Sequence, residues 1–200
     1  MSGSGADNLD QNFQRAVGAL PPTFEELFTE YRSLVYNVCL KFTGTPEDAE
    51  DVTQEVFTKI WRSLEDFQRQ SALRTWIYRI AMNTCIDHSR RPWRRFRHRN
   101  TTLEDILDQG KQKRYLSREE TAEGKLLAKE QAAQLRRAIT RLKPHLRAVL
   151  VLKDLEELSY DEIATILGIG IGTISSRLNR ARKALQEQLQ AFAPSFSRES

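Results

Sequence analysis

LSYDEIATILGIGIGTISSRLNRARK, residues 158–183, is the stretch that decides the fold of this chain. Ser159, followed three residues later by Glu162, forms a capping box that predicts the start of a short helix. Residues 168–170, Gly-Ile-Gly, predict a tight turn. A second, longer helix is expected to begin at Gly172, so the stretch predicts two helices joined by a turn.

Three positions give this helix pair the spacing of a helix-turn-helix. Ala164 lets the helices approach, Gly168 makes the turn, and the branched Ile174 locks the second helix. The face of the second helix that we expect to be exposed is polar and basic: Thr173, Ser175, Ser176, Arg177, Asn179, Arg180 and Lys183. Such side chains reach base edges and phosphates in a major groove. A plain helical hairpin with a solvated basic face is the alternative, and the combined pattern favours DNA binding.

Upstream residues complete a C-terminal domain at 126–190, followed by a tail at 191–200. Apolar residues at helical spacing predict one helix that ends near Lys143. They are Leu127, Ala128, Ala132, Leu135, Ala138, Ile139 and Leu142. Pro144 suits the first position of the next helix.

The residues at 23–66 predict two further helices of an N-terminal domain at 23–91. Thr23 is a plausible N-cap and Gly44 a stop signal for the first helix. Thr45 and Pro46 restart the chain as a second helix. Its predicted buried stripe contains Ala49, Val52, Val56, Phe57, Ile60, Trp61 and Leu64.

The third predicted helix lies in FQRQSALRTWIYRIAMNTCIDHSRR, residues 67–91. A polar loop precedes an apolar stripe, and an arginine run follows it. The stripe comprises Leu73, Trp76, Ile77, Ile80, Ala81 and Cys85, and the opposite face is expected to carry Arg74, Tyr78, Arg79, Asn83 and His88. Taken alone, the stretch fits a nucleic-acid-binding helix and an ordinary core helix equally well.

Composition sets the fold class and the domain count. The 200 residues are 40% hydrophobic and 29% charged, which is typical of a globular chain. With only nine Gly and six Pro and long segments of helical period, we predict an all-α protein of two small helical domains. The polar residues 1–22 predict a disordered tail, and 92–125 predict a flexible linker between the domains.

Several kinds of chemistry are not expected. We find no phosphate-binding glycine loop and no nucleophile with a placed base, so we predict no enzyme activity and no cofactor. The scattered His88, His98 and His145 make a metal site improbable. Cys39 and Cys85 fit buried apolar positions better than a disulfide. No signal peptide and no long apolar run appear, which predicts a cytoplasmic protein without membrane insertion.

Four sequence blocks, in this order, resemble those of bacterial sigma factors of the small extracytoplasmic-function (ECF) group. They are DAEDVTQEVF at 48–57, RTWIYRIAMN at 74–83, LSYDEIA at 158–164 and GTISSR at 172–177. The resemblance implies a protein that binds core RNA polymerase and directs it to promoters. The N-terminal domain would recognise and help open the minus-ten element, and the helix-turn-helix would read the minus-thirty-five element as duplex DNA.

The resemblance also implies roles for individual residues. It assigns polymerase binding to Asp51, Gln54, Glu55 and Phe57. The acids there also suit a helix dipole, and the sequence alone favours this simpler role. The resemblance assigns minus-ten DNA binding to Phe67, Arg69, Gln70, Ser71, Asn83, Arg90 and Arg91. For Phe67, packing under the loop fits as well as contact with a base.

Two positions depart from the family pattern and one other function remains open. The family often has Pro at Gly170 and a basic residue at Ser175, so the minus-thirty-five preference of relatives does not transfer.

Members of the group are commonly held inactive by an anti-sigma protein, an arrangement that the linker permits. The alternative function is a stand-alone dimeric helix-turn-helix transcriptional regulator.

Overall fold

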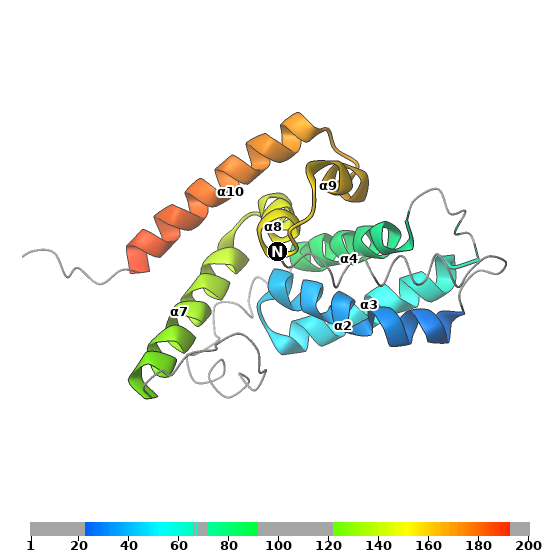
Figure 1. Cartoon of the computed structure of the whole chain (residues 1–200), viewed down its shortest axis with the longest axis horizontal. Coiled ribbons are helices and arrows are strands. Elements are labelled where there is room, and N and C mark those ends of the chain that lie inside the picture. Colours follow the sequence, from blue (N-terminus) through cyan, green and yellow to red (C-terminus); the bar gives the residue numbers. More distant parts are fainter. Residues whose placement is uncertain (1–22, 66, 68–71, 92–121, 193–200) are drawn as a thin grey trace, which may run out of the picture.

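The computed structural model describes residues 23–65, 67, 72–91 and 122–192 (Figure 1). Every regular element within these residues is a helix, which confirms the all-α prediction. The predicted tail at 1–22, residues 92–121 of the predicted linker and residues 193–200 lie outside the described residues. No described helix is long and apolar enough to cross a membrane.

The first helix, α2 (Phe24–Thr43), begins and ends at the predicted signals. The Thr23 hydroxyl accepts a hydrogen bond from the Glu26 N–H (3.3 Å), and the Glu26 carboxylate accepts one from the Thr23 N–H (2.9 Å). Gly44 ends the helix at φ 84°, a left-handed conformation that favours glycine. A Cβ at Gly44 would also overlap Thr140, so this position needs glycine for conformation and for space.

Helices α3 (Pro46–Ser63) and α4 (Leu73–Arg90) complete a bundle with α2. The Thr45 hydroxyl donates to the Asp48 carboxylate (2.8 Å) instead of accepting from a helix N–H. Cys39 of α2 and Cys85 of α4 are buried free thiols whose sulfur atoms lie 3.8 Å apart, as expected for apolar positions. Burial raises the pKa of the Cys85 thiol well above its ordinary value, which keeps it protonated.

The C-terminal part contains α7 (Ala122–Arg141), α8 (Pro144–Leu150), the π-helix η1 (Val151–Leu155), α9 (Tyr160–Leu167) and α10 (Ile171–Phe192). The predicted capping box starts α9: the Ser159 hydroxyl accepts from the Glu162 N–H (3.2 Å). Gly168 ends it at φ 64°. Helix α10 packs against α7, α8 and α9 and begins one residue before the predicted start.

Helix α4 lies at the centre of the molecule, between the α2–α3 pair and helices α8 and α9 (Figure 1). Residues from α2, α3 and α4 share one continuous buried cluster with residues from α8, η1, α9 and α10. A smaller cluster joins α7, α8 and α10. The two regions therefore pack together through α4 instead of standing apart.

Several residues differ from their predicted burial, among them Leu135 of the predicted apolar stripe of α7, which is 39% exposed. Trp61 is 64% exposed, although we expected it in the buried stripe of α3. Tyr78 and His88 were expected on the polar face of α4, and each is only 1% exposed. Helical spacing explains the differences on α3 and α4. Tyr78 and His88 lie on the same side of α4 as the buried Ala81 and Cys85, whereas Trp61 lies about 180° around α3 from the buried Val52.

Candidate nucleic-acid interface

Helix α10 presents the predicted polar and basic face to solvent. Its apolar side is buried through Ile174, Leu178 and Ala181. The predicted DNA-binding residues lie on the remaining surface: Thr173, Ser176, Asn179, Arg180 and Lys183 are exposed, and Ser175 and Arg177 are half-buried. The second helix of a helix-turn-helix enters a major groove in this way, with its outer side chains toward the bases.

Cationic groups from both regions gather near the start of α8. The pKa of His145 is lowered, first by its partial burial and then by the positive charges of Arg177, Lys143, Arg180 and Arg90. Arg90 ends α4, whereas Arg177 and Arg180 belong to α10. The packing of the two regions therefore brings the basic end of α4 close to the positive charges of α10. This combined positive charge suits a polyanion.

Helix α4 and the loop before it carry the predicted minus-ten residues. Asn83 is exposed, and its amide can donate to and accept from a base edge. Phe67 is half-buried and packs on Trp76, with ring centroids 4.8 Å apart. Arg69, Gln70 and Ser71 lie outside the described residues.

The two arginines at the end of α4 differ in their contacts. Arg90 is exposed and lies 4.0 Å from the Asp87 carboxylate, a weak surface pair. Arg91 donates two hydrogen bonds, of 2.7 and 2.9 Å, to the carboxylate of Glu55 on α3. This bidentate pair joins a predicted DNA-binding residue to a predicted polymerase-binding residue.

The outer face of α3 is mixed in charge and includes the large apolar side chain of Trp61. Asp51 and Gln54 are exposed, and Glu55 is half-buried. Phe57 is only 4% exposed and packs edge-on against Phe28, with ring centroids 4.8 Å apart, so it is a core residue. A hollow on this face is lined by Asp51, Gln54, Glu55, Thr58, Lys59, Arg62, His88 and Arg91.

One group of potential metal ligands occurs among the described residues. Ligand atoms of Asp48, Asp51 and His88 lie within 4.8 Å of one another. Burial is the main cause that lowers the pKa of His88. Lys59, Arg62 and Arg91 line the same hollow, and their positive charge disfavours a divalent cation. We therefore assign no metal to this group.

Trp61 is the surface residue that sequence reasoning missed. It lies three residues after Thr58 and seven after Gln54, both exposed, so these side chains share one face of α3. This spacing is visible in the sequence and was the available signal. A tryptophan with most of its surface in water suits a protein-binding site.

Comparisons with known proteins fit this geometry. Residues 27–95 match the family described as Sigma-70 region 2, and residues 132–185 match Sigma-70, region 4. The chain is 36% identical over 168 residues to the RNA polymerase sigma-H factor of Pseudomonas aeruginosa, covering 84% of this chain and 86% of that protein. It is 33% identical over 169 residues to the ECF RNA polymerase sigma-E factor of Haemophilus influenzae, covering 84% and 87%.

A solved structure shares the fold. The sigma factor RpoE from Bartonella quintana, in complex with the anti-sigma factor NepR, aligns with a TM-score of 0.55 at 24% identity. The alignment covers 84% of this chain and 96% of that chain.

Proposed function

The chain belongs to the ECF group of RNA polymerase sigma factors, and on this premise we propose that it binds core RNA polymerase and directs it to specific promoters. The observation that carries the proposal is the outward polar and basic face of α10 on a helix-turn-helix, in a chain that also matches region 2. A stand-alone dimeric regulator is not favoured, because the relatives that cover most of the chain are named as sigma factors.

The proposed minus-ten surface lies on α4 and on the loop before it. Asn83 would read a base edge, and Phe67, supported by Trp76, would form one wall of a pocket for an unpaired base. Arg69, Gln70 and Ser71 would supply its polar groups. Arg90 would hold a phosphate, which contributes affinity without sequence information. Arg91 would contact DNA only after its ion pair with Glu55 is broken.

The proposed minus-thirty-five surface is the exposed face of α10. Asn179 and Arg180 are exposed and would contact base edges. Thr173, Ser176 and Lys183, also exposed, would contact phosphates or bases at the groove edge. Ser175 and Arg177 are half-buried and would support this face.

The proposed polymerase surface is the outer face of α3. Asp51, Gln54 and Glu55 would face a basic or polar helical partner. Phe57 would contribute indirectly, as a buried core residue of α3. Trp61 would supply the exposed apolar anchor.

We propose no catalytic step and no cofactor for this protein, which would work in the cytoplasm with polymerase. An anti-sigma protein is a further proposed partner. The Bartonella quintana sigma factor that shares the fold was solved in complex with the anti-sigma factor NepR.

The function is tested by runoff transcription with purified core polymerase on a library of promoter fragments. Transcripts from a subset of fragments, absent with core polymerase alone, are expected. Tight dimeric binding to palindromic duplexes without polymerase, combined with no transcript above the core background, would overturn the proposal.

Arg180→Ala is expected to weaken binding of the holoenzyme to the minus-thirty-five duplex by about 1–3 kcal/mol, the worth of a base contact. Footprinting of a selected promoter would measure it. Arg182→Ala is the matched control on α10, because the Arg182 guanidinium pairs with Asp154 at 2.6 Å. Equal footprints for Arg180→Ala and the unmodified chain would remove Arg180 from the reading face.

A further inference from the structure

Two buried thiols of the N-terminal bundle face each other between helices α2 and α4. The Cys85 thiol donates a hydrogen bond to the sulfur of Cys39 at 3.8 Å, and both side chains are 0% exposed. Four residues one helical turn away are also fully buried and apolar: Val35 and Phe42 on α2, and Ala81 and Met82 on α4. The two sulfur atoms therefore form a closed pair inside the core.

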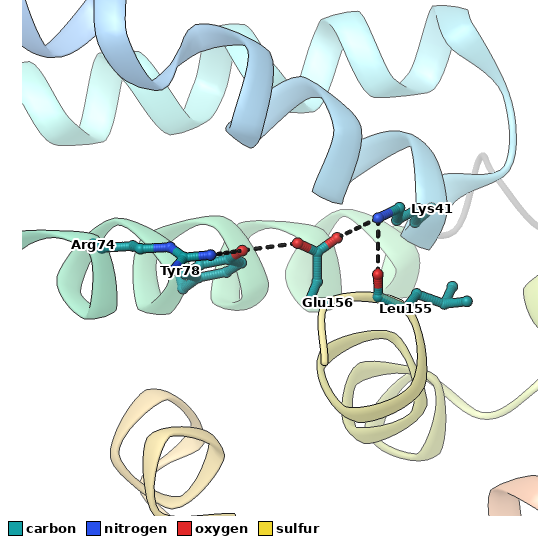
Figure 2. Close-up of polar contacts among 5 residues, drawn as sticks. All are labelled: Lys41, Arg74, Tyr78, Leu155 and Glu156. Atoms are coloured by element: carbon teal, nitrogen blue, oxygen red, sulfur yellow. Dashed lines mark hydrogen bonds and ion pairs between the residues drawn. The ribbon is translucent and has the colours of Figure 1, made fainter. Parts of the chain in front are cut away.

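The two helices are held in place beside this pair. Figure 2 shows the Glu156 carboxylate between Lys41 of α2, with which it forms an ion pair at 2.8 Å, and Tyr78 of α4, whose hydroxyl donates to it at 2.8 Å. Lys41 is two residues after Cys39. Tyr78 is seven residues, about two turns, before Cys85. Ligands on fixed helices keep their separation, which favours an ion between them because little order has to be gained on binding.

The distance between the sulfur atoms suits one metal ion shared by both. Thiolate–metal bonds of about 2.3 Å place two sulfurs roughly 3.8 Å apart in a tetrahedral arrangement and roughly 4.6 Å apart in a linear one. The observed separation of 3.8 Å is at the lower end of this range. Even a linear arrangement therefore requires the pair to open by less than about 1 Å.

The number and type of ligands decide which ion fits. Among the described residues, no carboxylate, imidazole or third thiol has a ligand atom within 4.8 Å of both sulfurs. Structural zinc sites take four ligands, and magnesium and calcium take oxygen ligands, so these ions lack what they need here. Soft thiolate ligands select copper(I), which two sulfurs alone can hold.

Positive charges near the pair suit bound thiolates. Two thiolates and one monovalent cation carry one net negative charge, which the core has to balance. Burial and the neighbouring Cys39 thiol raise the pKa of Cys85, whereas the charges of Arg147 and Lys59 act to lower it. The Lys59 ammonium donates to the hydroxyl of Thr84, the residue before Cys85, at 3.0 Å. These two cations are thus placed to stabilise thiolates once a metal replaces their protons.

We propose that Cys39 and Cys85 form a buried binding site for one soft monovalent cation of the copper(I) class, which joins α2 to α4 through two thiolates. The ion is a ligand of the fold and takes part in no reaction. An ion that binds the folded chain stabilises it, so binding raises the melting temperature. The inference goes beyond the proposed function and does not depend on it, since failure of runoff transcription would leave ion binding unchanged.

Silver(I) is the first probe, because it binds two thiolates as copper(I) does and does not oxidise them. The full chain is incubated with an equimolar amount of silver nitrate in chloride-free buffer, just below its melting temperature, where local opening admits the ion. Native mass spectrometry counts the bound ions, and circular dichroism measures the melting temperature. Copper(I), added as its bathocuproine disulfonate complex without oxygen, then gives the affinity from the loss of the colour of that complex.

Cys39→Ala and Cys85→Ala each remove one ligand, and Val38→Ala is the matched control. Val38 is 0% exposed and adjacent to Cys39, so its variant also loses buried volume but keeps both thiols. The unmodified chain and Val38→Ala are expected to hold one ion and to melt at a higher temperature with it. Each Cys variant is expected to bind copper(I) about 100-fold or more weakly, because loss of an outer-shell partner alone costs roughly 10–100-fold. If an alanine variant is not folded, Cys39→Ser or Cys85→Ser, closer to cysteine in size, replaces it.

No retained ion in the unmodified chain would overturn the site. Equal retention by the two Cys variants would also overturn it, since the ion would then bind elsewhere on the chain. A mass lower by the two thiol hydrogens, without an ion, would show that the pair forms a disulfide instead. Retention of the ion with no rise in melting temperature would contradict the joining of α2 to α4.

Discussion

Replacing Arg147 by alanine is expected to lower the free energy of unfolding by about 3 kcal/mol or more. Arg147 of α8 is only 6% exposed. Its guanidinium donates to the carbonyls of Phe42 (3.1 Å), Leu142 (3.0 Å) and Thr140, and lies 4.9 Å from the centroid of the Phe42 ring.

These three carbonyls explain the size of the effect. They stand at the ends of α2 and α7, where the last carbonyls of a helix lack partners within it and carry partial negative charge. A positive guanidinium with several donors satisfies them together, and a lysine cannot reproduce that fork. Each buried carbonyl left without its donor costs about 1–3 kcal/mol, and water recovers part of that cost. A domain stability of about 5–15 kcal/mol makes such a loss visible.

Urea unfolding followed by far-ultraviolet circular dichroism measures the loss. Arg182→Ala is the control, because Arg182 also makes two hydrogen bonds, to Asp154, but its side chain is 54% exposed. A surface pair of this kind is worth about 0–1 kcal/mol. Similar unfolding midpoints for the two variants would contradict the role that we assign to Arg147.

The helix boundaries could be predicted because their signals are local. The Thr23 and Ser159 capping boxes and the Gly44 and Gly168 stops each depend on a few neighbouring residues. The helix-turn-helix spacing is local in the same sense. These features hold whatever the rest of the chain packs against, so the sequence alone identified them.

Burial on α4 was harder to predict because α4 is covered from two sides. The predicted stripe left Tyr78 with the polar residues, although its spacing places it beside Ala81 and Cys85, and helices α8 and α9 cover that edge of the stripe. The contact between Tyr78 and Glu156 joins residues 78 positions apart. No local pattern reports such a pairing, and the predicted linker suggested separate domains.

The candidate site was predicted in part. Residues of the α10 face follow from helical spacing, and most of them are exposed. The ring contact of Phe57 with Phe28 and the ion pair of Arg91 with Glu55 could not be predicted, because both depend on tertiary packing. The minus-ten, minus-thirty-five and polymerase roles themselves stay predictions.

Trp61→Ala is expected to weaken binding of core polymerase by about 2 kcal/mol or more, roughly thirtyfold in the dissociation constant, while the stability of the free chain changes by about 0.5 kcal/mol or less. The small stability effect follows from position: Trp61 is 64% exposed. The large binding effect follows from chemistry, because a tryptophan anchor that is buried only in the complex gains its apolar contact there.

Titration of a dye-labelled chain with core polymerase measures the affinity, and urea unfolding of the same variant measures its stability. Leu135→Ala is the comparison, since Leu135 is an apolar side chain of α7, 39% exposed and away from α3. Its polymerase affinity is expected to match that of the unmodified chain. A loss of stability in Trp61→Ala as large as its loss of affinity would mean that Trp61 supports the fold of α3, and an unchanged affinity would move the polymerase anchor elsewhere on the bundle.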